Sequence, residues 1–125
     1  MKDERIYFRE RDLQIDLIKA IKNLYGDDVW IFKTNDQCRV GIPDLIICFY
    51  GHFVAIELKR QPRKAMRVDD PVERDEVAEY KDLTKLQKYN LMLINRSGGS
   101  AFPGRYFNEI MMRLAKIHET VNKIY

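Results

Sequence analysis

Apolar residues recur at helical spacing in two long stretches of the chain. The first stretch predicts an amphipathic helix that starts within residues 8–10 and ends at Gly26, a suitable C-cap. Its stripe is Leu13, Leu17, Ile21 and Leu24. The second stretch predicts a helix from Arg105 nearly to the C-terminus. Its stripe is Phe107, Ile110, Met111, Leu114, Ile117, Val121 and Ile124, which we interpret as core or as a subunit interface.

Three short apolar runs lie between these helices and predict β-strands. The first is Val29–Lys33, and the other two, Leu45–Tyr50 and Phe53–Leu58, flank a turn centred on Gly51. Two runs of this length around a glycine predict an antiparallel hairpin. In a hairpin the start of one strand and the end of the next lie at the same edge of the sheet.

A further helix is predicted to open at Thr84, because Thr84 and Gln87 have the spacing of a capping box. The segment 91–94 could instead form a strand, but we favour a helix that ends at Gly98-Gly99. Its apolar side is predicted to contain Leu83, Leu86, Leu93 and Ile94. A short edge strand over residues 100–103 is expected to end at Pro103.

The resulting order is helix, strand, strand, strand, helix, short strand, helix. It predicts an α/β protein: one domain over residues 1–125, with a small mixed β-sheet flanked by helices. A charged segment at about 60–82 reads as an insertion whose basic first part precedes an acidic second part.

Composition adds little about function. The net charge of +3 and pI of about 8.8 do not by themselves indicate a nucleic-acid-binding protein. Cys38 and Cys48 lack the spacing of a zinc site or a disulfide framework. No apolar run approaches the roughly 20 residues that a membrane span needs. We therefore expect a soluble, cytoplasmic protein without membrane contact.

Three charged residues meet at one edge of the predicted hairpin. Asp44 stands at the entrance of its first strand, and Glu57 and Lys59 stand at the end of its second. Carboxylates at the ends of apolar strands need compensation, and hard oxygen ligands favour Mg²⁺ or Mn²⁺. The alternative is a structural Glu57–Lys59 ion pair, with Asp44 capping the turn after Pro43.

Pro43-Asp44 followed by Glu57-Leu58-Lys59 resembles the signature of the PD-(D/E)XK nuclease superfamily. The approach through Gly41 and a later glutamine make the chain most similar to the virus-type replication-repair nuclease (VRR-NUC) domain. The resemblance spans roughly residues 8–113 and implies the restriction-endonuclease-like core.

The resemblance implies a Mg²⁺-dependent endodeoxyribonuclease, with Mn²⁺ as a substitute and no small-molecule cofactor. Asp44, Glu57 and the backbone carbonyl of Leu58 would bind the metal. Lys59 would orient the attacking water or stabilise charge on the phosphorus, and we favour the electrostatic role.

Two helical residues are candidates for the same pocket. Glu10 belongs to the inward stripe of the first helix, although an acid in a first turn also complements the helix dipole. In the resembled family a glutamate there helps to hold the metal and its water. Gln14, one turn later, would face the same pocket. Gln87 is either a capping residue or the active-site glutamine of the family, and the second role requires its side chain to turn inward.

Basic residues near this edge are candidates for phosphate contacts, although each could equally be solvated. They are Lys33, Arg39, Arg60, Arg63, Lys64 and Arg67.

Stand-alone members of the resembled family are typically virus-encoded homodimers that cut branched DNA such as Holliday junctions. The resemblance therefore implies a role in DNA repair or recombination, in a bacterial or phage-infected cytoplasm. Two other hypotheses remain: a noncatalytic nucleic-acid-binding module on the same fold, and a structural domain with ion-paired hairpin ends.

Overall fold

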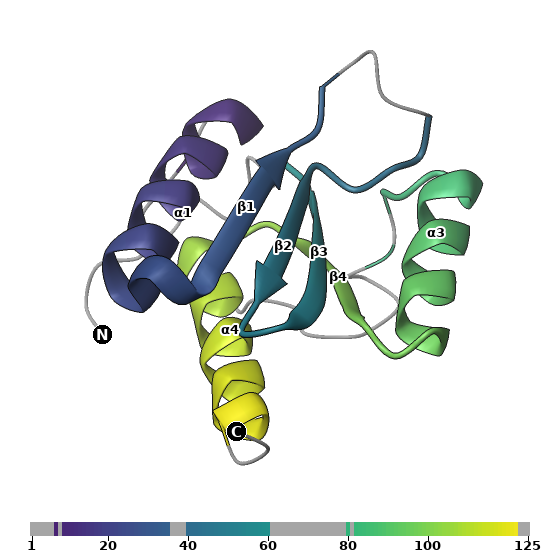
Figure 1. Ribbon diagram of the computed structural model, residues 1–125. Helices are drawn as coiled ribbons and strands as arrows, with labels where there is room; N and C mark the ends of the chain where they lie inside the picture. The colour runs from purple at the N-terminus through teal and green to yellow at the C-terminus, as the bar shows by residue number, and fades with distance from the viewer. Residues whose placement is uncertain (1–6, 8, 36–39, 61–79, 81, 123–125) are drawn as a thin grey trace.

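A four-stranded sheet with the order β1-β2-β3-β4 forms the centre of the molecule (Figure 1). Its strands are β1 (Val29–Lys33), β2 (Leu45–Phe49), β3 (His52–Leu58) and β4 (Ser100–Gly104). β1, β2 and β3 pair antiparallel, whereas β3 and β4 pair parallel, so the sheet is mixed. The computed structural model describes residues 7, 9–35, 40–60, 80 and 82–122.

Within the described residues, three α-helices cover the sheet, which confirms the predicted α/β class. They are α1 (Glu10–Tyr25), α3 (Lys85–Arg96) and α4 (Phe107–Asn122), and a short 3₁₀ turn, η1 (Gly26–Asp28), links α1 to β1. Figure 1 places α1 and α4 together and α3 on the opposite side of the sheet. Among the described helices, none is long and apolar enough to cross a membrane.

The predicted hairpin is formed by β2 and β3, with boundaries shifted by one residue. Tyr50 lies in the turn and not in the first strand, and the second strand begins at His52. Tyr50 and Gly51 have φ angles of 52° and 79°. Positive φ at both central residues is the mark of a type I′ turn, whose twist matches that of the flanking strands.

Side chains alternate between two apolar layers along the strands. Leu45, Ile47 and Phe49 of β2 join the main core beneath α1 and α4, together with Ile56 of β3. A smaller cluster beneath α3 contains Ala55, Leu83, Leu91 and Ala101. Each face of the sheet therefore has its own core.

The α4 stripe is core and not a subunit interface. Phe107, Ile110, Leu114 and Val121 are buried within the chain, and Ile117 packs against the same cluster. The predicted end of this stripe, Ile124, lies outside the described residues.

Two predicted core positions are wrong. Leu24 is 64% exposed, because the aromatic partners at the end of α1, Phe49 and Tyr50, contact Tyr25 instead. Leu86 is also exposed, because α3 turns Leu91 toward the sheet. The strand alternative for residues 91–94 is excluded, since α3 is helical through Arg96.

β4 lies at the edge of the sheet, as predicted, but continues one residue past Pro103 to Gly104. An edge position tolerates proline because the missing N–H would otherwise face an unpaired side.

Candidate functional site

Asp44 stands where the chain enters β2 and is attached directly to the end of β3. Its carboxylate oxygen Oδ2 accepts a hydrogen bond from the backbone N–H of Leu58 at 2.7 Å. Its backbone carbonyl accepts from the N–H of Thr34 at 3.0 Å. The acid is therefore held between the ends of β1 and β3, at the edge of the sheet that the sequence predicted.

The approach to Asp44 is fixed by contacts that the sequence did not reveal. The hydroxyl of Thr34 lies 2.9 Å from the carbonyl oxygen of Pro43, and Asn90 of α3 donates to the carbonyl of Gly41 at 3.0 Å. Gly41 has a φ of +87°, and a Cβ there would lie 2.5 Å from the Leu86 side chain. No simple motif identifies Thr34 or Asn90, because their partners are backbone atoms of a distant loop.

Glu57 is a buried acid, only 4% exposed. Burial, a side-chain hydrogen bond with Asp44 and the negative charge of Asp44 together raise the pKa of Glu57 to about 9. The positive charge of Lys59 lowers the pKa of Glu57, whereas the negative charge of Glu10 raises it further. Glu57 therefore holds a proton at neutral pH when no cation is bound.

Glu10, at the first turn of α1, reaches the same edge. Partial desolvation and the negative charge of Asp44 raise the pKa of Glu10, while Lys59 and Arg60 lower it. The backbone N–H of Arg60 also donates a hydrogen bond to the Glu10 carboxylate. The structure thus brings Glu10 together with Asp44, Glu57 and Lys59. The Glu10 side chain itself remains exposed to solvent.

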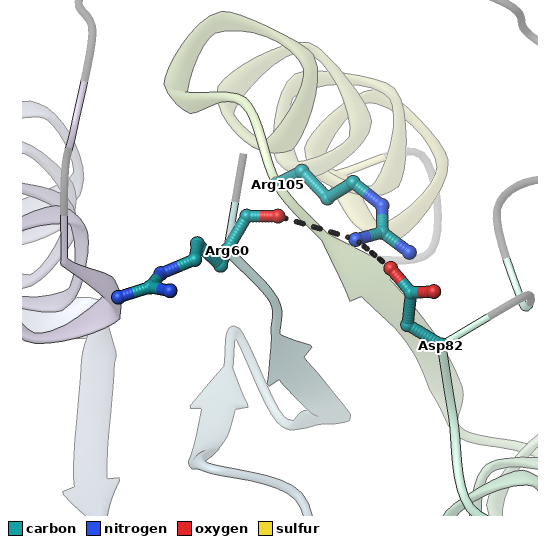
Figure 2. A network of polar contacts seen from close by, with 3 residues as sticks. All are labelled: Arg60, Asp82 and Arg105. Atoms are coloured by element: carbon teal, nitrogen blue, oxygen red, sulfur yellow. Dashed lines mark hydrogen bonds and ion pairs between the residues drawn. The ribbon is translucent and has the colours of Figure 1, made fainter. Parts of the chain in front are cut away.

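The segment that follows Glu57 is tied to the edge strand and to the start of α4. The N–H of Lys59 donates to the carbonyl of Gly104 at 2.9 Å. Arg105 donates from one guanidinium nitrogen to the carbonyl of Arg60 at 3.3 Å and to Asp82 at 3.1 Å (Figure 2). In Figure 2 the guanidinium of Arg60 extends away from Arg105, toward α1.

The structure does not bring the Gln87 side chain into this group. Its Oε1 accepts from the N–H of Thr84 at 2.9 Å, and its own N–H donates to the Thr84 hydroxyl at 3.1 Å. This is the complete capping box, so the side chain turns back to the cap. Gln14 is 7% exposed on the sheet side of α1, as expected for an inward residue.

The predicted phosphate contacts can be placed only in part. Lys33 is exposed at the end of β1, and Arg60 is exposed directly after Lys59. Arg39, Arg63, Lys64 and Arg67 lie outside the described residues.

The donor set is compatible with Mg²⁺ held by few protein ligands. Among the residues that the structure describes, no group of three or more His, Cys, Asp or Glu side chains is arranged to hold a metal ion. Asp44 and Glu57 remain as a close carboxyl pair, and Mg²⁺ usually takes one or two carboxylates and keeps several waters. The role of Glu10 as a further ligand stays a prediction.

The overall arrangement is similar to that of a solved structure described as a VRR_NUC domain protein. The superposition has a TM-score of 0.55 and covers 86% of this chain and 85% of the other, at 15% sequence identity. The chain has the fold of a VRR_NUC domain. No family model and no curated protein matches the sequence. The VRR_NUC resemblance of the sequence is thus confirmed at the level of the fold.

Proposed function

We propose that this chain is a metal-dependent nuclease that hydrolyses phosphodiester bonds in DNA. The observation that carries the proposal is the convergence of Glu10, Asp44 and Glu57 beside Lys59 at one edge of the sheet. Structural ion pairs seldom crowd three acids around one lysine, whereas a metal site needs an excess of negative charge. The similarity of the fold to a VRR_NUC domain protein supports the proposal of a nuclease.

Asp44 and Glu57 would bind Mg²⁺, or Mn²⁺ in its place, with the carbonyl of Leu58 as a further ligand. Bound there, the ion would lower the pKa of a coordinated water and neutralise charge on the scissile phosphate. The hydrogen bond from Leu58 N–H keeps Asp44 in place before any ion arrives. The proton that Glu57 holds must leave when the ion binds.

Lys59 and Glu10 would act on the groups around the ion. The backbone of Lys59 is fixed by Gly104, so its side chain starts from a defined position beside the two carboxyls. Its positive charge would stabilise the negative charge that builds on the phosphate in the transition state. Glu10, anchored by the Arg60 N–H, would accept a hydrogen bond from a metal-bound water.

The proposed substrate is branched DNA such as a Holliday junction, and the proposed assembly is a homodimer. Both rest on the resemblance to stand-alone VRR-NUC proteins. Two symmetry-related strands are cut together only if two active sites face the junction. Because the α4 stripe is core, the subunit interface would have to use another surface. A monomeric mass in solution with unimpaired junction cleavage would contradict the dimer.

The test is cleavage of end-labelled four-way junction, duplex and single-stranded DNA with Mg²⁺, Mn²⁺ or EDTA. We expect Asp44→Asn and Glu57→Gln to lose activity by about 100-fold or more, since both variants retain the shape of the site. Lys59→Ala should lose cleavage but retain Mg²⁺ binding. The matched control is Asp27→Ala. This variant removes an exposed acid from the turn η1, which is not part of the group formed by Asp44 and Glu57.

The outcomes separate the proposal from its alternative. Full activity in both carboxyl variants would show that the assigned site is wrong. DNA binding without cleavage under either metal would favour a noncatalytic nucleic-acid-binding module on the same fold.

A further inference from the structure

None of the helices in the described part of the chain covers the β1 side of one sheet face. α3 packs over β3 and β4, where its partners are Ala55 and Ala101. Over β1 and at the start of β3 the same face carries large exposed side chains. Trp30 and Phe32 of β1 are 60% and 43% exposed, and Phe53 of β3 is 45% exposed. Figure 1 shows α3 standing beside β4, away from β1.

Cross-strand register places these aromatic residues on one surface. Trp30 pairs with Cys48, and Cys48 pairs in turn with Phe53, so all three side chains project to the same side. Phe32 lies two residues from Trp30 and shares that side. We call Trp30, Phe32 and Phe53 the aromatic face.

Two of its rings are already stacked. The rings of Trp30 and Phe32 are parallel within 2°, with centroids 5.8 Å apart. A parallel stack leaves a flat ring face at each end, and every nucleobase has a π-face that can extend such a stack. Aromatic side chains buried in a protein interface have no need for this parallel arrangement, since edge-to-face contacts serve equally well.

The charges around the aromatic face suit a phosphate backbone. α3 borders the face and carries Lys85, Lys88 and Arg96, all exposed, with no acidic residue in its sequence. A single nucleic-acid strand is held by this combination of stacking rings and flanking cations.

The aromatic face leads to the candidate catalytic edge. Phe32 pairs with Ile46, which lies two residues after Asp44. We propose that the aromatic face binds single-stranded DNA by stacking unpaired bases on Trp30, Phe32 and Phe53, next to the carboxyl site. The inference rests on the proposed function for its reason to bind DNA, and it specifies the substrate as DNA with unpaired nucleotides beside the cut.

Trp30 is the only tryptophan of the chain and therefore reports on the face directly. The experiment titrates the full-length protein with oligo(dT) in EDTA, where metal-dependent cleavage cannot occur, and records tryptophan fluorescence. We expect saturable quenching, weaker with blunt duplex of equal length, and a lower affinity at higher salt.

Substitutions test whether the aromatic rings contribute to oligo(dT) binding. Phe32→Ala and Phe53→Ala should each weaken oligo(dT) binding about fivefold or more, whereas Phe32→Tyr and Phe53→Tyr, which keep the ring, should bind nearly as well as wild type. Leu24→Ala and Met112→Ala remove exposed apolar side chains from α1 and α4 and should leave binding unchanged. Thermal unfolding verifies that each variant is folded.

The inference would be overturned by no quenching with oligo(dT), by equal quenching with duplex, or by undiminished affinity in both alanine variants. A shift of the Trp30 emission with protein concentration alone would also overturn it, because a second copy would then cover the face. The proposed function fails separately. Quenching without any cleavage leaves the inference standing, whereas junction cleavage without quenching leaves the nuclease assignment standing.

Discussion

The carboxylate of Asp44 accepts a hydrogen bond from the backbone N–H of Leu58 at 2.7 Å. This contact joins the start of β2 to the end of β3 beyond their last ladder pair, Leu45 with Ile56. Asp44 is therefore a structural residue and a candidate metal ligand at once. Substitutions at this position have to separate these two roles.

Asp44→Asn should keep the fold and lower the pKa of Glu57. The asparagine oxygen can still accept from Leu58, but the negative charge that disfavours ionised Glu57 is gone. Burial is the largest cause of the shift and persists, so the pKa should fall and still exceed its ordinary value of 4.5. Carboxyl ¹³C chemical shifts followed through a pH titration measure it.

Asp44→Ala serves as the contrasting variant, because it leaves the Leu58 N–H without an acceptor. A buried unpaired N–H costs about 1–3 kcal/mol, so Asp44→Ala should be less stable than Asp44→Asn by that order. Equal stability of the two variants would mean that the Asp44–Leu58 bond contributes nothing to folding.

Without metal, stability should fall as pH rises. The pKa of Glu57 is about 9 in the folded protein against 4.5 as its ordinary value, so the folded state holds a proton that the unfolded state releases. The stabilisation of the folded state by protonated Glu57 is complete below pH 4.5 and is lost as pH rises through about 9. The slope is at most about 1.4 kcal/mol per pH unit for one proton. Glu10 contributes in the same direction.

Urea unfolding in EDTA at several pH values between about 5 and 9 measures this dependence. Glu57→Gln should flatten it, leaving only the contribution of Glu10. Added Mg²⁺ should restore stability at high pH in wild type alone, since the ion binds the ionised form. A wild-type profile as flat as that of the variant would contradict the raised pKa.

Gly41→Ala should be more damaging than Gly98→Ala. Both glycines have positive φ, +87° and +101°, so either alanine meets backbone strain of about 1 kcal/mol or more. Only at Gly41 would the new Cβ also clash, 2.5 Å from the Leu86 side chain, whereas nothing lies within 4 Å at Gly98. Chemical denaturation of both variants gives the difference directly.

Leu86→Ala should relieve the clash in the Gly41→Ala background and leave the backbone strain. If the two glycine variants are equally stable, the close contact between Gly41 and α3 does not exist in solution.

Gln87→Glu should preserve stability and cleavage, whereas Gln87→Ala should lose about 0.5–1 kcal/mol of stability. A glutamate at the third helical position still accepts from the Thr84 N–H and completes the capping box, but alanine does not. Thermal unfolding and junction cleavage are measured on both variants. A stable Gln87→Glu protein that no longer cleaves would assign Gln87 to the active site after all.

The elements that depend on local signals were predictable. The hairpin around Gly51, the capping box at Thr84 and the stop at Gly26 each follow from residue types a few positions apart. The meeting of Asp44 with Glu57 also followed, because a hairpin fixes which strand ends are neighbours.

Features that depend on tertiary partners were not predictable. Leu24 and Tyr25 are both apolar residues at the end of α1, and only the position of Phe49 and Tyr50 decides which is buried. Gln87 has the same sequence context for capping and for an inward role, and only its contact with Thr84 separates them. The exposure of the aromatic face could not be predicted either, since it depends on the position of α3 on the sheet.

The parallel pairing of β3 with β4 has a consequence for folding. The hairpin joins neighbours in sequence and can form early, but Lys59 is fixed only when Gly104, far along the chain, reaches it. Closing such a long loop is slow compared with closing a hairpin turn. We expect a folding intermediate, if one accumulates, to contain the acids of the site before its lysine is fixed. The charged group at this edge of the sheet would then be complete only after β4 has joined β3.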